Sequence, residues 1–279
     1  MRRAALFVIS VLMAATLRAH PGIGIVVDSR GSVFYTDLRQ VWRLAPSGQL
    51  SIAVPAVHTH ELMLDAKDNL YGEHLWYEGD ATKKWQHYFW RRTPDGVVEV
   101  FAPTHEAFRA PERFTLVRDR AGNMYDADRE HNNAIVKIAP DGKRLVIARG
   151  NFRDIRWMAA SPEGTVYFID STDLLRVAPD GRVTTLARNL SRRRLIRPDI
   201  GEHHLVMGLW SDRRGNVYVA DYAGGLVKQV AASGRVTVVA ESHLPWSVTG
   251  GTFAPNGDLW LLEYRVGVGD TARARRAQR

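Results

Sequence analysis

The chain has 279 residues, of which 45% are hydrophobic and 24% are charged, the balance of a soluble globular protein with one large or two small domains. This composition excludes a largely disordered chain, and the presence of only one long apolar run excludes a multi-span membrane protein. The lack of cysteine excludes disulfides, thiolate metal ligands and a cysteine nucleophile.

Residues 1–19 are predicted to form a signal peptide. Arg2 and Arg3 give a positively charged start, and the mostly apolar run from Ala4 to Leu17 is short for a membrane span. Cleavage after Ala19 predicts a secreted or periplasmic protein. The alternative is an uncleaved anchor.

The positive net charge does not indicate a nucleic-acid partner. The formal net charge is +8, and loss of the signal removes three arginines and no acid, which leaves +5. Much of this excess lies in residues 192–194 and 273–279. Because a nucleic-acid binder carries a basic stripe across its folded body, we expect no nucleic-acid partner. We also expect a monomer, with no membrane contact beyond the signal.

One short pattern recurs six times: a tight turn, a short strand, and an acid or histidine at the end of that strand. The copies are Asp28–Asp37, Asp65–His74, Asp119–Asp128, Ser161–Asp170, Asp212–Asp221 and Ala254–Glu263. Five copies place glycine at the fourth position, where a hairpin turn requires a positive φ. β-Branched or aromatic residues follow, as is typical of strands.

A second motif follows the first and predicts two further strands in each unit. It is typified by Leu174–Gly181, a strand that ends in Ala-Pro-Asp-Gly, after which Val183–Ala187 reads as another strand. Four short strands in units of roughly forty to fifty residues predict an all-β fold, a six-bladed β-propeller of four-stranded antiparallel blades, over residues 20–270. The last blade is expected to be incomplete. Residues 271–279 form either a basic tail or its third strand.

Over residues 22–264 these two motifs resemble the NHL-repeat propellers and the senescence-marker-protein/gluconolactonase-like proteins. The resemblance implies a lactonase-like hydrolase or lyase that uses a divalent metal, calcium in the gluconolactonase-like relatives or zinc in the amidating-lyase propellers. Asp170 and Asp221, at matching strand ends, would then be the catalytic general bases.

Propeller connectivity brings the start of each first strand and the end of each second strand to one mouth of the channel. The second-strand ends are Asp37, His74, Asp128, Asp170, Asp221 and Glu263. His58 and His60 are two residues apart and therefore point the same way on a strand. With His74 and His203 they are the predicted ligands of a divalent metal, zinc or calcium. The alternatives are a hydrogen-bonded polar rim and acids that satisfy neighbouring loop amides.

The longest insertion, Leu75–Trp90, is rich in aromatic residues and extends from the same mouth. We predict that Trp76, Tyr77 and Trp85, with Arg156 and Trp246, bind a small-molecule or glycan ligand. An extended hairpin that buries its own rings is the alternative. Two functions stay open: an exported ligand-binding propeller with metal-dependent hydrolase or lyase activity, and a non-catalytic module that binds a protein or glycan at this mouth.

Overall fold

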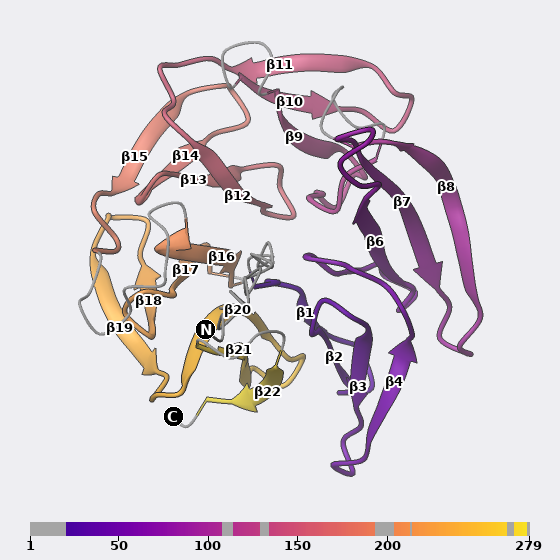
Figure 1. Ribbon diagram of the computed structural model, residues 1–279. Helices are drawn as coiled ribbons and strands as arrows, with labels where there is room; N and C mark the ends of the chain where they lie inside the picture. The colour runs from indigo at the N-terminus through magenta and orange to yellow at the C-terminus, as the bar shows by residue number, and fades with distance from the viewer. Residues whose placement is uncertain are drawn as a thin grey trace, which may run out of the picture.

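A computed structural model describes residues 21–107, 114–128, 134–192, 204–212, 214–266 and 271–277. Six antiparallel sheets surround a central axis, so the predicted six-bladed β-propeller is confirmed (Figure 1). The predicted signal peptide lies outside the described residues. Within them, no helix is long and apolar enough to cross a membrane.

The first three blades follow one another around the ring in chain order. Blade 1 contains β1 (Ile25–Val27), β2 (Val33–Thr36), β3 (Val41–Leu44) and β4 (Leu50–Val54). Blade 2 contains β5 (Met63–Leu64), β6 (Leu70–Tyr77), β7 (Trp85–Arg92) and β8 (Val98–Glu106). Blade 3 contains β9 (Met124–Asp128), β10 (Ala134–Ile138) and β11 (Arg144–Ala148). An isolated bridge between Arg118 and Met124 stands where the inner strand of blade 3 is expected.

The remaining three blades complete the ring. Blade 4 contains β12 (Ile155–Ala160), β13 (Val166–Asp170), β14 (Asp173–Val177) and β15 (Val183–Ala187). Blade 5 contains β16 (Val206–Ser211), β17 (Val217–Asp221), β18 (Leu226–Val230) and β19 (Val236–Glu241). Blade 6 contains β20 (Trp246–Phe253), β21 (Leu259–Arg265) and β22 (Ala272–Arg276). The last blade therefore has three strands, as the sequence predicted, and β22 is its outer strand.

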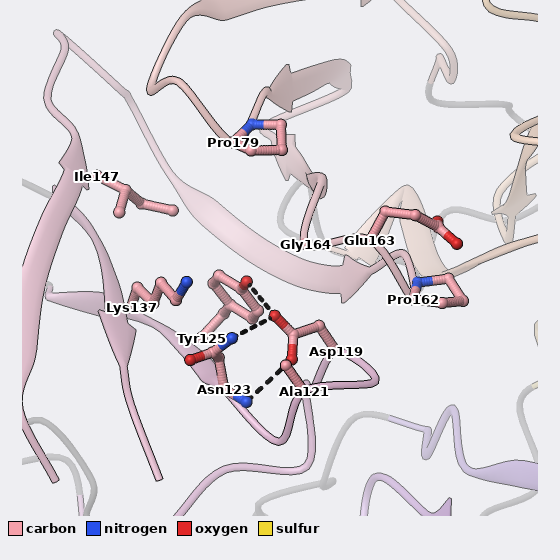
Figure 2. Close-up of a pocket in the computed structure, with 10 residues that line it drawn as sticks. All are labelled: Asp119, Ala121, Asn123, Tyr125, Lys137, Ile147, Pro162, Glu163, Gly164 and Pro179. Atoms are coloured by element: carbon pink, nitrogen blue, oxygen red, sulfur yellow. Dashed lines mark hydrogen bonds between the residues drawn. The ribbon is translucent and has the colours of Figure 1, made fainter. Parts of the chain in front are cut away.

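The repeated Asp-x-x-Gly-Asn-x-Tyr segment is a hydrogen-bonded unit that holds the first turn of a blade against its second strand. In blade 3, Asp119 accepts hydrogen bonds from the Asn123 amide at 2.9 Å, from Asn123 Nδ2 at 2.7 Å and from the Tyr125 hydroxyl at 2.8 Å (Figure 2). Gly122 has φ of 82°, the left-handed value that this turn requires. Asp65 and Asp212 make the same three contacts in blades 2 and 5, so the motif stabilises the fold.

The core lies between neighbouring blades, where the apolar faces of the sheets meet. Its largest cluster joins blades 4, 5 and 6 and includes Trp157, Val206, Val219 and Val248. Trp157 Nε1 donates a hydrogen bond to the Val206 carbonyl at 3.2 Å, which satisfies the polar atom of a buried indole across the interface. Each blade is thus stabilised mainly by its two neighbours.

Blades 6 and 1 meet at a seam that no shared strand crosses, since β1–β4 and β20–β22 form separate sheets. The Tyr264 hydroxyl donates a hydrogen bond to the Thr36 carbonyl at 3.0 Å across this seam. Ile25, Tyr35 and Leu262 pack beside it in a common apolar cluster. Side-chain packing and one buried hydrogen bond therefore close the ring.

Candidate functional site

The acids at the second-strand ends, predicted as a ring at the mouth, are bound to neighbouring groups of the protein. Asp170 Oδ1 accepts hydrogen bonds from the amides of Arg153 at 2.8 Å and Asp154 at 2.7 Å. Asp221 lies 2.7 Å from Lys228 Nζ and 2.5 Å from Ser191 Oγ. Both carboxylates are buried. Their proposed role as general bases stays a prediction, and their contacts are those of residues that hold loops.

Two other acids at this end of the ring have similar contacts. Asp37 accepts the amides of Arg39 and Gln40 and the Trp42 indole, the last at 2.7 Å. Glu263 is fully buried, and Arg273 Nε and Arg275 Nη2 each lie 2.8 Å from its carboxylate. The alternative in which these acids satisfy neighbouring loop amides describes Asp37, whereas the partners of Glu263 are side chains.

The aromatic insertion is an extended β6–β7 hairpin whose strands pair from Leu70–Arg92 to Tyr77–Trp85. Trp90 is buried in the cluster shared with blade 1, and Phe89 lies 4.9 Å from the Phe114 ring at the start of blade 3. The two faces of the hairpin therefore pack against different blades. Because side chains alternate along a strand, Glu73 and His74 lie on opposite faces.

His58 and His74 meet on the face toward blade 1. The His58 amide donates a hydrogen bond to His74 Nδ1 at 3.0 Å, which occupies one of the two ring nitrogens of His74. The His58 ring meets the His60 ring edge to face, with centroids 4.7 Å apart. Burial and the nearby charges of His60 and His74 lower the pKa of His58 to about 4, so its imidazole is neutral at physiological pH. A neutral imidazole accepts a proton or a metal ion.

His60 begins a row of titratable groups that crosses blade 2 on its other face. His60 Nδ1 lies 3.6 Å from Glu73 Oε1, and His87 Nδ1 lies 3.7 Å from Glu73 Oε2. His87 Nε2 then lies 2.5 Å from His105 Nε2 on β8. We call these four residues the His–Glu row. The row runs from the loop that leads into β5, at the mouth, to β8, the outermost strand of the blade.

The two imidazoles beside Glu73 keep its carboxylate ionised. Burial alone would raise the pKa of Glu73, but hydrogen bonds and charges of His60 and His87 outweigh it and lower this pKa to about 2. His105 Nδ1 lies 3.0 Å from the Pro103 carbonyl at the outer end of the row.

The described residues contain no group of three or more histidine, aspartate or glutamate side chains arranged to hold a metal ion. His58 and His60 face each other, but His74 Nδ1 accepts an amide and lies across the strand from Glu73. His203, the fourth predicted ligand, lies outside the described residues. The four-histidine metal site therefore stays a prediction.

The predicted ligand-binding aromatic residues form two contact groups on the hairpin. Trp76 and Tyr88 contact the His74 ring, with centroid separations of 5.3 and 5.1 Å. Tyr77 and Trp85 pair at 5.3 Å near the hairpin tip, and Trp85 is 40% exposed. The first group packs on itself as the hairpin alternative expected, while the second presents a ring to solvent.

Arg156 and Trp246, also predicted to bind substrate, stand on other blades. Arg156 Nε pairs with Asp154 Oδ2 at 2.8 Å at the start of β12. The guanidinium of Arg273 lies 4.2 Å from the ring centroid of Trp246 on β20. Both residues have partners within their own blades, and neither belongs to the His–Glu row.

Residues 22–24 cross the channel beside the histidines. This crossing was not predicted from the sequence. The amides of Ile23 and Gly24 both donate to the His60 carbonyl at 2.8 Å. On the other side, a Cβ added to Gly250 would lie 2.2 Å from the Ile23 carbonyl oxygen. A side chain at Gly250 is therefore excluded by the crossing segment, which fixes the backbone that carries His60.

His87 and His105 are the functional candidates that inspection of the sequence missed. His87 pairs with Leu75 in the hairpin, which places it diagonally opposite Glu73, and His105 pairs directly with His87. Diagonal and direct cross-strand neighbours lie within reach of long side chains. Aligning β6 and β7 about their turn gives the hairpin register, and this register shows that Glu73 and His87 are diagonal neighbours.

Comparisons with known proteins confirm the expected propeller resemblance at the level of fold. A gluconolactonase from Xanthomonas campestris has a TM-score of 0.61 at 14% identity, over 94% of this chain and 87% of that one. A calcium-binding regucalcin from Agrobacterium tumefaciens has a TM-score of 0.56 at 16% identity, over 91% and 85%. The neighbours thus include the lactonase-like group that the repeats indicated.

A lyase propeller is also similar. Virginiamycin B lyase from Staphylococcus aureus, in a catalytically inactive histidine-to-alanine form with quinupristin, has a TM-score of 0.51 at 14% identity, over 93% of this chain and 85% of that one. No protein-family model matches the chain. No curated protein matches it either. At these identities the similarity defines the fold, a six-bladed propeller, and leaves the chemistry to the site.

Proposed function

We propose that this chain is an exported, lactonase-like propeller that hydrolyses or cleaves a small molecule at the channel mouth beside blade 2. The observation that carries the proposal is the position of Glu73 between His60 and His87, at 3.6 and 3.7 Å. A carboxylate beside one imidazole nitrogen fixes the ring and its tautomer and supports proton transfer at the other nitrogen. His58, neutral and edge-on to His60, is the second group for such transfer.

The chemistry is written for a lactone or ester. One imidazole of the His58–His60 pair accepts a proton from water as the water oxygen bonds to the carbonyl carbon. The ester C–O bond then breaks, and the imidazolium returns that proton to the leaving alkoxide, so that an acid and an alcohol form. General acid–base catalysis of this kind contributes about 10²–10⁴-fold in rate.

The direct test is hydrolysis of a panel of lactones and esters by the wild type, His58→Gln and His60→Gln. We expect kcat/KM to fall by about 10²–10⁴-fold in the variant that lacks the catalytic ring. His243→Gln, at an exposed histidine before β20, is the matched control and should keep full activity. If both His58→Gln and His60→Gln remain folded and fully active, or if the wild type hydrolyses nothing in the panel, the proposal fails.

Metal content is the second measurement, made on tag-free protein beside a His58→Ala/His60→Ala double mutant. Stoichiometric zinc that the double mutant loses would move the chemistry to a metal at these histidines. Calcium that the double mutant retains would move it to the acids at the strand ends. Either result replaces the acid–base proposal with the metal-dependent one that the calcium-binding regucalcin similarity suggests.

One observation favours the second function, a non-catalytic module. Trp85 is 40% exposed at the tip of a hairpin that extends from the mouth, and Tyr77 lies beside it. Exposed aromatic pairs are typical of glycan and protein contacts. Binding of glycans or a protein partner that Trp85→Ala abolishes, in a protein without hydrolytic activity, would support this function instead.

A further inference from the structure

The opposite end of the propeller carries grooves between neighbouring blades, and one of them departs from the repeat. The Asp-x-x-Gly turns and the Pro-Asp-Gly turns meet at this end. Between blades 3 and 4 they enclose a groove of about 310 Å³ lined by residues that include Asp119, Tyr125, Lys137, Pro162 and Pro179 (Figure 2). Between blades 1 and 2 the equivalent groove has about 140 Å³.

The smaller groove contains three arginines. Its lining consists of Asp28, Arg30, Phe34, Arg43, Asp68, Arg92 and Pro94. Alignment of the repeats places Arg30 where blade 3 has Ala121, and Arg43 where it has Lys137. The groove is therefore smaller and more basic than its counterpart, although both are built from the same turns.

Arg92 is the clearest departure. Four residues before the second turn glycine, the other units have aliphatic residues: Leu44, Ile138, Val177 and Val230. Three of these four are fully buried core residues. Arg92 instead extends toward blade 1, with its guanidinium 5.7 Å from the Phe34 ring centroid and its Nε donating to the Ala53 carbonyl at 3.2 Å. A charged group at a core position costs stability unless it has a counter-charge.

No described carboxylate forms a salt bridge with Arg43 or Arg92. Arg43 Nη2 donates to Ser32 Oγ at 3.0 Å, and Arg92 Nη1 donates to the Thr93 carbonyl at 3.1 Å. Burial and the charge of Arg43 lower the pKa of Arg92, as expected for two guanidiniums held near each other. Several of their N–H groups stay available to a ligand in the groove.

The charges of Asp95 and Asp28 partly oppose the lowering of the Arg92 pKa, but the two acids of the groove have other hydrogen-bond partners. Asp28 Oδ1 accepts the amides of Arg30 at 3.0 Å and Ser32 at 2.7 Å. Asp68 accepts the Ser29 amide at 3.0 Å and the Ser29 hydroxyl at 2.5 Å. Asp28 thus holds its own turn, and Asp68 ties the turn of blade 2 to that of blade 1.

We propose that the groove between blades 1 and 2 binds an oxyanion, the phosphate or carboxylate group of a small molecule, through Arg43 and Arg92. An oxyanion between them would accept charge-assisted hydrogen bonds from both guanidiniums and remove their repulsion. Arg30, on the turn above, adds a third positive charge. The groove lies at the end of the channel opposite the His–Glu row.

The test is calorimetric titration with inorganic phosphate, and separately with succinate, at constant ionic strength set by chloride. We expect one anion per chain, bound at least tenfold more weakly by Arg92→Leu. This variant should fold, because an aliphatic residue occupies the same position in four other blades. Arg43→Gln tests the second guanidinium. Lys137→Gln, in the equivalent groove of blades 3 and 4, is the matched control and should bind like the wild type.

Thermal unfolding supplies an independent readout. For a tenfold loss of affinity, the phosphate-induced rise in Tm should be roughly 3 °C larger for the wild type than for Arg92→Leu once phosphate exceeds both dissociation constants. The general stabilising effect of phosphate acts equally on both proteins and cancels in this difference. Tighter binding of phosphate or of succinate identifies the anion class. Equal affinity of the wild type and Arg92→Leu, or binding of neither anion, overturns the proposal.

Discussion

At the scale of single residues, environment divides the histidines and acids of this chain into charged and neutral groups. Glu73 keeps its negative charge because two imidazoles contact it, whereas His58 is kept neutral by burial and by neighbouring positive charge. Both pKa values are lowered, which leaves Glu73 charged and His58 neutral, and both residues lie near His60. Such a separation of protonation states is typical of functional sites.

The neutral state of His58 predicts a pH dependence of stability. Its pKa falls from an ordinary 6.5 to about 4 on folding, so between these values the unfolded chain binds a proton that the folded chain does not. The stability of the fold with a neutral, buried His58 is therefore full above pH 6.5, and part of it is lost as the pH falls toward 4. Urea unfolding at pH 7.5 and pH 5 should show a larger loss for the wild type than for His58→Gln. Equal losses would contradict the prediction.

The turn aspartates predict a second pH effect, at lower pH. Burial tends to raise the pKa of Asp119, but hydrogen bonds from Asn123 and Tyr125 outweigh it and lower the pKa. Its stabilising contribution is therefore present above the ordinary aspartate pKa of about 4 and is lost as the pH falls below it. Tyr125→Phe, which removes one donor, should cost about 1 kcal/mol of unfolding free energy at pH 7. The difference between Tyr125→Phe and wild type should shrink at pH 3, as measured by urea unfolding.

Local sequence predicted the turns well because a turn depends on neighbouring residues. It predicted the site incompletely because the site depends on contacts between strands. The Gly122 turn depends on residues within one short segment, so its motif is visible in the sequence. The contact of Glu73 with His87 depends on the register of a hairpin, and the burial of Asp221 beside Lys228 depends on the next strand. Asp170 and Asp221 end β13 and β17 as predicted, whereas Glu263 lies within β21, and the partners of these acids could not be predicted.

At the scale of elements, the outer strand of the last blade is attached by charge as well as by backbone pairing. Glu263 on β21 is fully buried and lies 2.8 Å from Arg273 Nε and Arg275 Nη2 of β22. It also accepts a hydrogen bond from Ser242 Oγ at 2.6 Å. The arginines of β22, which the sequence offered equally as a basic tail, are in the structure the partners of a core carboxylate.

The contact of Glu263 with Arg273 and Arg275 predicts that removing the arginines costs more stability than removing the carboxylate. Arg273→Gln/Arg275→Gln leaves a buried carboxylate without a cation and should cost about 3–5 kcal/mol. Glu263→Gln leaves only arginines that are 42% and 29% exposed, and these remain hydrated, so it should cost less. The triple variant should recover much of the loss of the double one. Chemical denaturation of the three variants checks the order, and a larger cost for Glu263→Gln would contradict it.

At the scale of the whole molecule, the repeat made the ring predictable and left its closure open. Six copies of one turn-and-strand motif specify six blades because each blade uses the same local pattern. Blade 3 still differs, since only an isolated bridge stands at the place of its inner strand. The seam depends on contacts such as Tyr264 with Thr36, 228 residues apart, which no local pattern encodes.

The seam predicts where the ring opens first. Tyr264→Phe removes the hydroxyl that satisfies the buried Thr36 carbonyl and should cost about 1–3 kcal/mol. Hydrogen exchange should become faster in β1, β2 and β21 than in blades 3 and 4, because local opening there no longer breaks that bond. Tyr167→Phe, in blade 4, is the matched control. Uniformly faster exchange around the ring would contradict a local role for the seam.

Mechanically, the molecule is a ring with one cut, because the chain does not connect blade 6 to blade 1. The blades follow one another in chain order, so the interface between blades 6 and 1 is the one junction that no covalent connection spans. A tensile load applied between blade 1 and blade 6 would part that interface before any sheet is pulled apart. Residues 22–24 lead into β1 and are hydrogen-bonded to the His60 carbonyl, so they would move with blades 1 and 2 and leave Gly250 of blade 6. Separation of the seam thus removes the contact that excludes a side chain at Gly250.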